Sequence, residues 1–370
     1  VVTIKPKPAQ PDILFNTLGT HTFTWTVVNG PCVSSDNITL DFIQQPNAYA
    51  GADATTCGNE ITLSGIQSVT GSVANWTGNG NFASATSFET QVTGSTFGAV
   101  TFVLRESIGP CWDEDEVTIT FIQKPNPVIT NTYDTVCGVN GSLNVLNTVG
   151  SGLWAAYYNN QILNGVNYAN GASSSNTAVT IPGYPANEHS RTVKFVWRET
   201  NVANGVQCKD SVATYITFSE KPVALIDNDA AERCGNTIQL HAIGSEWANR
   251  RWVSPYVQNP FDDPTSPDAT VTIPSPASFG DSAHVTYPFI WTVKNTGCVA
   301  LDTMWVTFYQ IPQANAGLDA SVCGLETDLQ AFWSIPASSN YNPTGVWSTI
   351  PIPYETADIE NTYDPNSHVT

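Results

Sequence analysis

Short segments in which apolar and polar residues alternate recur along the chain. Ile61-Thr62-Leu63, Leu143-Asn144-Val145 and Ile238-Gln239-Leu240 each follow shortly after a Cys-Gly pair. Alternation with a period of two is typical of a half-buried β-strand, and no segment shows a sustained period of 3.6 residues. The pattern therefore predicts an all-β protein.

The same order of signals is written four times. After each Cys-Gly pair comes a tryptophan, and after the first three pairs a Thr/Val segment and then an aromatic strand follow it. About seven strands in roughly 90 residues is typical of an immunoglobulin-like sandwich, and the repetition predicts tandem copies in an extended rod. Because the aromatic positions recur at one phase, we expect them in the cores rather than on a binding surface: Trp76, Trp154, Trp252, Trp347, Phe102, Phe195, Trp197, Phe289 and Trp291.

Prolines mark the predicted joints, because proline cannot donate to a sheet ladder. They stand at Pro46, Pro125, Pro222 and Pro312. We therefore expect whole domains at 47–125, 126–222 and 223–312. Residues 1–46 match the last strands of a domain and 313–370 match the first ones, so further repeats are expected as partners at both ends. The joints are short, which favours a stiff rod.

Composition narrows the function. A formal net charge of −19 over 370 residues argues against binding to nucleic acid. No apolar run is long enough to span a membrane, and the first residues lack a basic signal-peptide region. Eight cysteines without zinc spacing favour a disulfide framework, and hence an oxidising, extracellular location.

Three pairing schemes are open for these cysteines. In the first scheme each cysteine pairs with the next Cys-Gly along the chain. A final strand, a joint and a first strand then separate the two cysteines, which is farther than a disulfide can reach. Pairing within a domain, such as Cys57 with Cys111, puts the partners at opposite ends of one sandwich.

The third scheme joins neighbouring domains. It favours bonds between Cys57 and Cys208 and between Cys137 and Cys298. Cys234 and Cys323 would then bond to later domains, and Cys32 and Cys111 would bond to earlier domains or remain free thiols.

Two strings carry a resemblance to a known family. Ala-x-Ala-Gly-x-Asp-x-x-x-Cys-Gly occurs at 48–58 and 314–324, and Phe-x-Trp-x-Val-x-Asn-Gly-Pro-Cys at 23–32. They resemble the Ig/PKD-like repeats of giant cell-surface adhesins from gliding Bacteroidetes, over the whole chain. The resemblance implies export by the type IX system and a place at the cell surface, in a protein of gliding motility.

The resemblance also implies modification sites. Asp-Ser/Thr-aliphatic tripeptides are O-glycosylated in Bacteroidetes, and the candidates here are Thr135, Ser211, Ser282 and Thr303. Independently of it, Asp113 and Asp115 lie in a dense acidic cluster. A solvated turn is the favoured interpretation of that cluster, and a calcium site is the alternative.

No motif of a hydrolase, metalloprotease or nucleotide-binding enzyme is present, so we expect no enzymatic activity and no cofactor. The favoured function is a structural stalk or filament segment of a large surface adhesin, reinforced by disulfides. One alternative is an array whose loops bind glycans, proteins or other filament copies. Another is the non-catalytic tail of a secreted enzyme.

Overall fold

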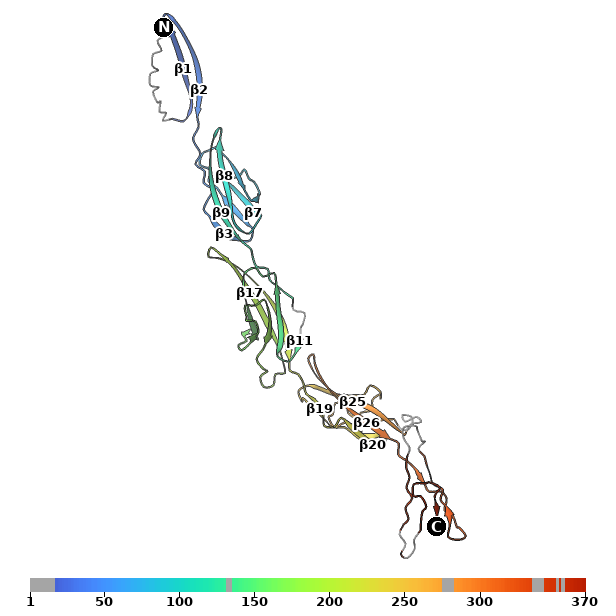
Figure 1. Ribbon diagram of the computed structural model, residues 1–370. Helices are drawn as coiled ribbons and strands as arrows, with labels where there is room; N and C mark the ends of the chain where they lie inside the picture. Colours follow the sequence, from blue (N-terminus) through green and yellow to red (C-terminus); the bar gives the residue numbers. More distant parts are fainter. Residues whose placement is uncertain (1–16, 131–134, 275–282, 335–342, 351–352, 354–356) are drawn as a thin grey trace.

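The computed structural model describes residues 17–130, 135–274, 283–334, 343–350, 353 and 357–370. Over these residues the secondary structure is entirely β, arranged as tandem immunoglobulin-like sandwiches. Figure 1 shows the sandwiches following one another end to end, so that the molecule is a long rod with the β1–β2 hairpin near one tip and the carboxyl terminus near the other. The fold class predicted from the alternating pattern is confirmed.

The first sandwich consists of two sheets. One sheet has the order β3-β9-β8-β5 and the other β4-β7-β6. Their bounds are β3 (Ala54–Cys57), β4 (Glu60–Ser64), β5 (Val73–Gly78), β6 (Gly80–Phe82), β7 (Glu89–Gly94), β8 (Gly98–Ile108) and β9 (Cys111–Ile122). β3 runs parallel to β9, whereas the other pairs are antiparallel, which is the strand arrangement of an immunoglobulin-like domain.

The second sandwich repeats this plan with longer arms. Its sheets have the orders β11-β18-β17-β13-β14 and β10-β12-β16-β15. The bounds are β10 (Val128–Ile129), β11 (Thr135–Cys137), β12 (Asn140–Leu146), β13 (Ser151–Tyr158), β14 (Gln161–Ile162), β15 (Asn167–Tyr168), β16 (Asn176–Thr180), β17 (Ser190–Ala203) and β18 (Val206–Ser219). The Asn204-Gly205 turn has positive φ at both residues, which matches the right-handed twist of a tight hairpin.

The third sandwich has the sheet β20-β26-β25-β23, faced by the pairs β19-β22 and β21-β24. The bounds are β19 (Ala224–Ile226), β20 (Ala230–Cys234), β21 (Thr237–Gln239), β22 (Ala242–Gly244), β23 (Asn249–Val253), β24 (Thr270–Thr272), β25 (His284–Asn295) and β26 (Cys298–Tyr309). The two ends of the chain contribute smaller units. They are the hairpin β1 (Gly19–Asn29) with β2 (Cys32–Phe42), and the pairs β27 (Ala314–Asn315) with β29 (Phe332–Trp333) and β28 (Thr327–Asp328) with β30 (His368–Val369).

Each sandwich has its own core around one tryptophan. Trp76, Trp154 and Trp252 are at most 3% exposed. Trp154 packs on Trp197 with 5.2 Å between ring centroids, and Trp252 packs on Trp291 at 5.1 Å. A buried ring of this size removes about 150–250 Å² from water, which at ~25 cal/mol per Å² stabilises the fold by roughly 4–6 kcal/mol before entropy is counted.

The remaining predicted core aromatics divide in two. Phe102, Phe195 and Phe289 are fully buried. Trp347, predicted to be a core residue, is only half-buried, so that prediction is wrong for the structure described. The physical reason is that the tryptophans of the sandwiches are covered by a strand of the long hairpin, and no described strand covers Trp347 in this way.

Candidate functional site: the joints between sandwiches

The turn of each long hairpin lies against the sandwich that precedes it in the chain. Cys208 at the β17–β18 turn is bonded to Cys57 of the first sandwich, with 5.6 Å between Cα atoms. Cys298 at the β25–β26 turn is bonded to Cys137 of the second, at 5.3 Å. These are the two bonds that the neighbour-joining scheme requires.

The other two pairing schemes are wrong for these four cysteines. Cys57 ends β3 opposite Ile122, the last residue of β9, whereas Cys111 begins β9 at the other end of the sandwich. Cys32, Cys111, Cys234 and Cys323 are free thiols.

The Cys-Gly pair owes its place to a parallel strand contact. Each such cysteine ends a short strand that runs beside the last strand of its sandwich, opposite Ile122, Ser219 or Tyr309. The following glycine has positive φ, and its N–H donates to the carbonyl of that opposite residue at 2.7–2.9 Å. Because positive φ strains any side chain with a Cβ, glycine is required there. The result is a cysteine held at the base of each sandwich.

An asparagine completes each joint. Asn201 lies directly across the hairpin from Cys208, and Asn295 lies across from Cys298. Asn201 Nδ2 donates to the carbonyl of Gln123 at 2.9 Å, and Asn295 Nδ2 donates to that of Glu220 at 3.1 Å. Both acceptors are the first residue after the last strand of the preceding sandwich. We call the disulfide together with this Asn-to-carbonyl bond the clasp.

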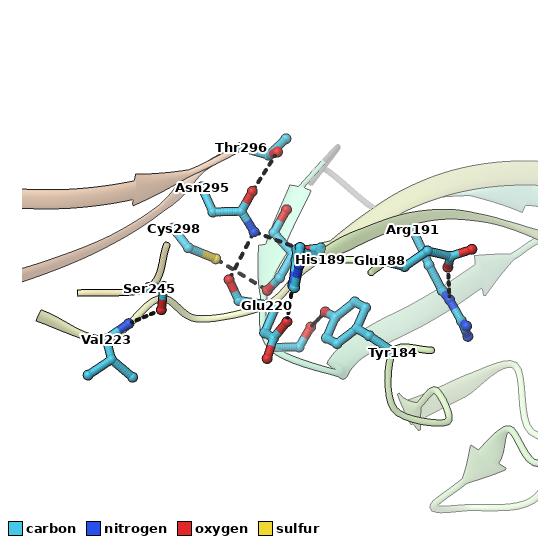
Figure 2. Close-up of polar contacts among 12 residues, drawn as sticks. Tyr184, Glu188, His189, Arg191, Glu220, Val223, Ser245, Asn295, Thr296 and Cys298 are labelled. Atoms are coloured by element: carbon cyan, nitrogen blue, oxygen red, sulfur yellow. Dashed lines mark hydrogen bonds and ion pairs between the residues drawn. The ribbon is translucent and has the colours of Figure 1, made fainter. Parts of the chain in front are cut away.

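The second joint has further contacts on the residues that Figure 2 shows. Asn295 Nδ2 also donates to the carbonyl of His189 at 2.8 Å, and the His189 ring lies 2.7 Å from a carboxylate oxygen of Glu220. The His189 ring stacks on Trp247 of the third sandwich with 4.0 Å between centroids. Trp247 therefore packs within the joint.

Tyr184 anchors the base of the second sandwich near this joint (Figure 2). Its hydroxyl donates to the carbonyl of Gly138, next to the bonded Cys137, at 2.9 Å. Burial, and then the negative charge of Glu220, raise the pKa of Tyr184 to about 12 against the opposing effect of Arg191. The hydroxyl thus remains a donor throughout the neutral range.

The first joint has different accessory contacts. Asn204 Nδ2 lies 3.2 Å from the hydroxyl of Thr55 and 3.1 Å from that of Thr120. The longer arms β17 and β18 carry the turn past Cys208, so that it reaches along the first sandwich. The two joints therefore share the clasp and differ in what surrounds it.

Two buried glutamates brace the ends of the first and second sandwiches. Glu106 is fully buried and accepts hydrogen bonds from the N–H groups of Ser68 and Val69 and from the hydroxyls of Ser68 and Ser72. Burial alone would raise the pKa of Glu106, but these hydrogen bonds outweigh it and the pKa is lowered. Glu199 is equally buried and accepts from the N–H groups of a loop at 149–150.

Two carboxylates of the acidic cluster accept hydrogen bonds from backbone N–H groups. Asp113 accepts a hydrogen bond from the N–H of Ala48 at 2.9 Å, and Asp115 accepts from that of Ala50 at 2.8 Å. Among the described residues, no group of three or more His, Cys, Asp or Glu side chains is placed to hold a metal ion. The two carboxylates thus fasten the first residues of the sandwich to β9.

The predicted glycosylation sites differ in accessibility. Thr135 and Ser211 are exposed, Thr303 is half-buried, and Ser282 lies outside the described residues. Thr135 begins β11 close to the Gly297 turn, so a sugar there would crowd the second joint. Glycosylation stays a prediction.

Sequence reasoning found the cysteines and missed the asparagines and glutamates. Asn29 and Asn295 stand three residues before a cysteine, but Asn201 stands seven before, because its hairpin is longer. Glu106 is in phase with Phe102 and Leu104 on β8, and this phase is the signal that its side chain points inward.

Comparison with known proteins gives solved structures only. No family model and no curated protein matches the chain. Among solved structures, the titin I-band fragment I67–I69 aligns at 9% identity over 72% of this chain and 96% of that one, with a TM-score of 0.34. Mouse cadherin-23 EC22–24 aligns at 9% identity over 72% and 99%, with a TM-score of 0.30. Sidekick-1 immunoglobulin domains 1–4 align at 11% over 78% and 82%, with a TM-score of 0.29.

At TM-scores this low the matches carry no argument about function, and the immunoglobulin-like assignment rests on the strand order. Within the described part of the chain, no helix is long and apolar enough to cross a membrane.

Proposed function

We propose that this chain is a stiff, load-bearing stalk segment of an extracellular protein, without catalytic activity of its own. The observation that carries the proposal is that both disulfides connect one sandwich to the next. Disulfides persist in oxidising compartments, which favours a location outside the cell. A covalent bond and an Asn-to-carbonyl bond at one joint restrain bending there more than a short linker alone.

The two covalent loops overlap. The bond from Cys57 to Cys208 encloses one stretch of chain, and the bond from Cys137 to Cys298 encloses another. Residues 137–208 belong to both. When the chain is pulled, the extension between Cys57 and Cys298 is therefore limited by the length of this shared stretch. The covalent path through it is about 170 residues shorter than the direct path along the chain.

Single-molecule stretching tests the proposal. With both bonds intact, the fully unfolded chain should be roughly 560–610 Å shorter between its ends than after reduction, at ~3.3–3.6 Å per bypassed residue. The variant carrying C57S and C137S should match the reduced protein. C111S is the control and should match the oxidised parent, since Cys111 is a free thiol. Equal lengths before and after reduction would remove the basis of the stalk proposal.

The finer proposal is that the stalk belongs to a bacterial cell-surface adhesin of the gliding type. It is supported by the sequence resemblance at 23–32, 48–58 and 314–324. Antibodies against the first sandwich should label intact cells of the source organism. Labelling only after cell lysis would contradict this placement.

A further inference from the structure

The base of the third sandwich resembles the bases at the two occupied joints, but no hairpin clasps it in the structure described. Cys234 ends β20 opposite Tyr309, and the N–H of Gly235 donates to the Tyr309 carbonyl at 2.8 Å, as at the other two bases. Cys234 is an exposed free thiol. Beside it lies a cavity of about 500 Å³, room for a few side chains, between the third sandwich and residues 313–370.

The described part of residues 313–370 keeps the local geometry of a sandwich start. The N–H of Gln313 donates to the hydroxyl of Ser334 at 3.1 Å. The same bond joins Val223 to Ser245 in the third sandwich, at 3.0 Å. The cavity can therefore be compared position by position with the occupied joint before it.

The β1–β2 hairpin carries the features of a clasping hairpin. Asn29 lies across from Cys32 and Trp25 lies across from Asp36, as Asn295 lies across from Cys298 and Trp291 from Asp302. Cys32 is an exposed free thiol. Trp25 is 75% exposed, whereas Trp291 is fully buried. Figure 1 shows this hairpin at the opposite end of the rod from β26, whose last residue lines the cavity, so one copy cannot fill its own cavity.

Two contacts at the occupied joint and two within the third sandwich identify four counterpart residues in the cavity. Cys298 bonds to the base cysteine, and Asn295 donates to the first carbonyl after the last strand. Trp291 packs on the core tryptophan, and Asp302 accepts from the N–H of Ile226 at 2.6 Å. The residues at the corresponding positions, all of which line the cavity, are Cys234, Gln310, Trp347 and Ala316.

We propose that the cavity is a docking site for the β1–β2 hairpin of a second copy of this chain. Trp25 packs on Trp347, Asn29 donates to the Gln310 carbonyl, and Asp36 accepts from the Ala316 N–H. Cys32 then bonds to Cys234. The contact joins different surfaces on the two copies and does not close, so it propagates into end-to-end filaments. The inference goes beyond the stalk proposal, which concerns single chains.

The covalent step needs an external oxidant, and a small-molecule disulfide such as oxidised glutathione supplies it. The Cys234 thiolate attacks the glutathione disulfide and releases one reduced glutathione. The Cys32 thiolate then attacks the mixed disulfide, forms the Cys32–Cys234 bond and releases the second. Two thiol hydrogens and two electrons leave the protein and are recovered in two glutathione thiols.

The test uses purified protein of residues 1–370 in a glutathione redox buffer, across a range of protein concentrations. We expect a concentration-dependent ladder of multimers on non-reducing gels, and peptide mapping should find the Cys32–Cys234 bond. C32S and C234S should each abolish the ladder. C111S and C323S are the matched controls and should leave it unchanged.

The non-covalent contacts are tested separately, by sedimentation velocity of the C32S protein with and without a further substitution. W25A should abolish association, and N29A and D36N should each weaken it about 2–10-fold, the measured range for one hydrogen bond. Circular dichroism of W25A verifies that the sandwiches remain folded.

Three outcomes would overturn the proposal. One is a protein that stays monomeric at ~100 µM with Cys32 and Cys234 both reduced. Another is linkage distributed over the four free thiols without preference. The third is a bond from Cys234 to a cysteine outside residues 1–370 in a longer chain, which would assign the cavity to that chain's own hairpin. The stretching experiment uses single molecules, so its result is independent of these.

Discussion

The first and third sandwiches carry different residues at the same position of the same strand. Glu106 in β8 and Val293 in β25 each stand two residues after the side chain that covers the core tryptophan. Both are fully buried. One core therefore ends in a carboxylate and the other in a branched aliphatic group.

The segment that faces each of these positions explains the difference. In the first sandwich the loop presents the N–H groups of Ser68 and Val69 to Glu106. In the third, Val293 lies so close to Gly244 that a Cβ on the glycine would be 3.0 Å from a Val293 methyl group. This comparison teaches that the fold accepts a buried charge at this position only where loop donors face it.

The largest expected loss of stability comes from placing a carboxylate at position 293, where no hydrogen-bond donors face it. V293E should destabilise the third sandwich by more than about 4 kcal/mol, because a buried carboxylate would be left unpaired. Hydrogen exchange of whole-chain protein should show loss of protection in β25 and β26. V293A is the control and should cost about 1–3 kcal/mol from its cavity. Full protection of β25 in V293E would break the comparison.

The reverse exchange should cost somewhat less. E106V leaves the N–H groups of Ser68 and Val69 without an acceptor, and we expect a loss of about 3 kcal/mol or more in the first sandwich. E106Q keeps one acceptor oxygen and should lose about 1–2 kcal/mol. Exchange protection of β8 and β9 measures both. An E106V protein as stable as E106Q would show that these hydrogen bonds contribute little.

Acid should act on the first sandwich through the same group. The pKa of Glu106 is lowered from 4.5 in the folded state, so its stabilisation is fully present above the unfolded pKa and is lost as the pH falls through the folded one. The melting temperature of the first sandwich should therefore fall below about pH 4.5, and it should fall less in E106Q. Val293 does not titrate and contributes no such dependence. Identical acid profiles for parent and E106Q would contradict this assignment.

The smallest effect concerns the clasp. N201A removes one Asn-to-carbonyl hydrogen bond and N295A removes two. Each lost bond should weaken the adjacent disulfide by about 0.5–1.5 kcal/mol, which raises its reduction potential by roughly 10–30 mV. Redox titration with mass-spectrometric counting of thiols measures this. N29A serves as control, since Asn29 ends β1, which lies at the tip of the rod before the first sandwich. A reduction potential unchanged in both variants would mean that the Asn-to-carbonyl hydrogen bond does not stabilise the disulfide.

Much of this architecture could be predicted from the alternation and the repeat. The strand direction alone favoured Cys208 over Cys111 as the partner of Cys57. The direction of the strands places Cys57 and Cys111 at opposite ends of one sandwich, whereas Cys208 lies at the end of the next sandwich that faces Cys57. The position of Trp76 at a recurring phase gave its place in a core. Each of these inferences rests on residues that recur at the same position in several repeats.

What could not be predicted depends on partners distant in sequence. Glu106 can be read as inward-facing from its phase, but nothing in the sequence shows that the N–H groups of Ser68 and Val69 will face it. Asn201 was hidden because its hairpin is longer than the others, so alignment on the Asn-Gly turn drew attention to Asn204. Trp347 has the right phase, yet burial depends on a covering strand.

The backward direction of each bond sets an order of maturation. Cys57 lies in a sandwich that can close by residue 122, whereas its partner Cys208 lies in the next one. A chain that emerges from its amino-terminal end must therefore carry Cys57 as a reactive thiol until the following sandwich has folded. The second sandwich thus seals the first and the third seals the second, so that the bonds form in order from the amino-terminal side.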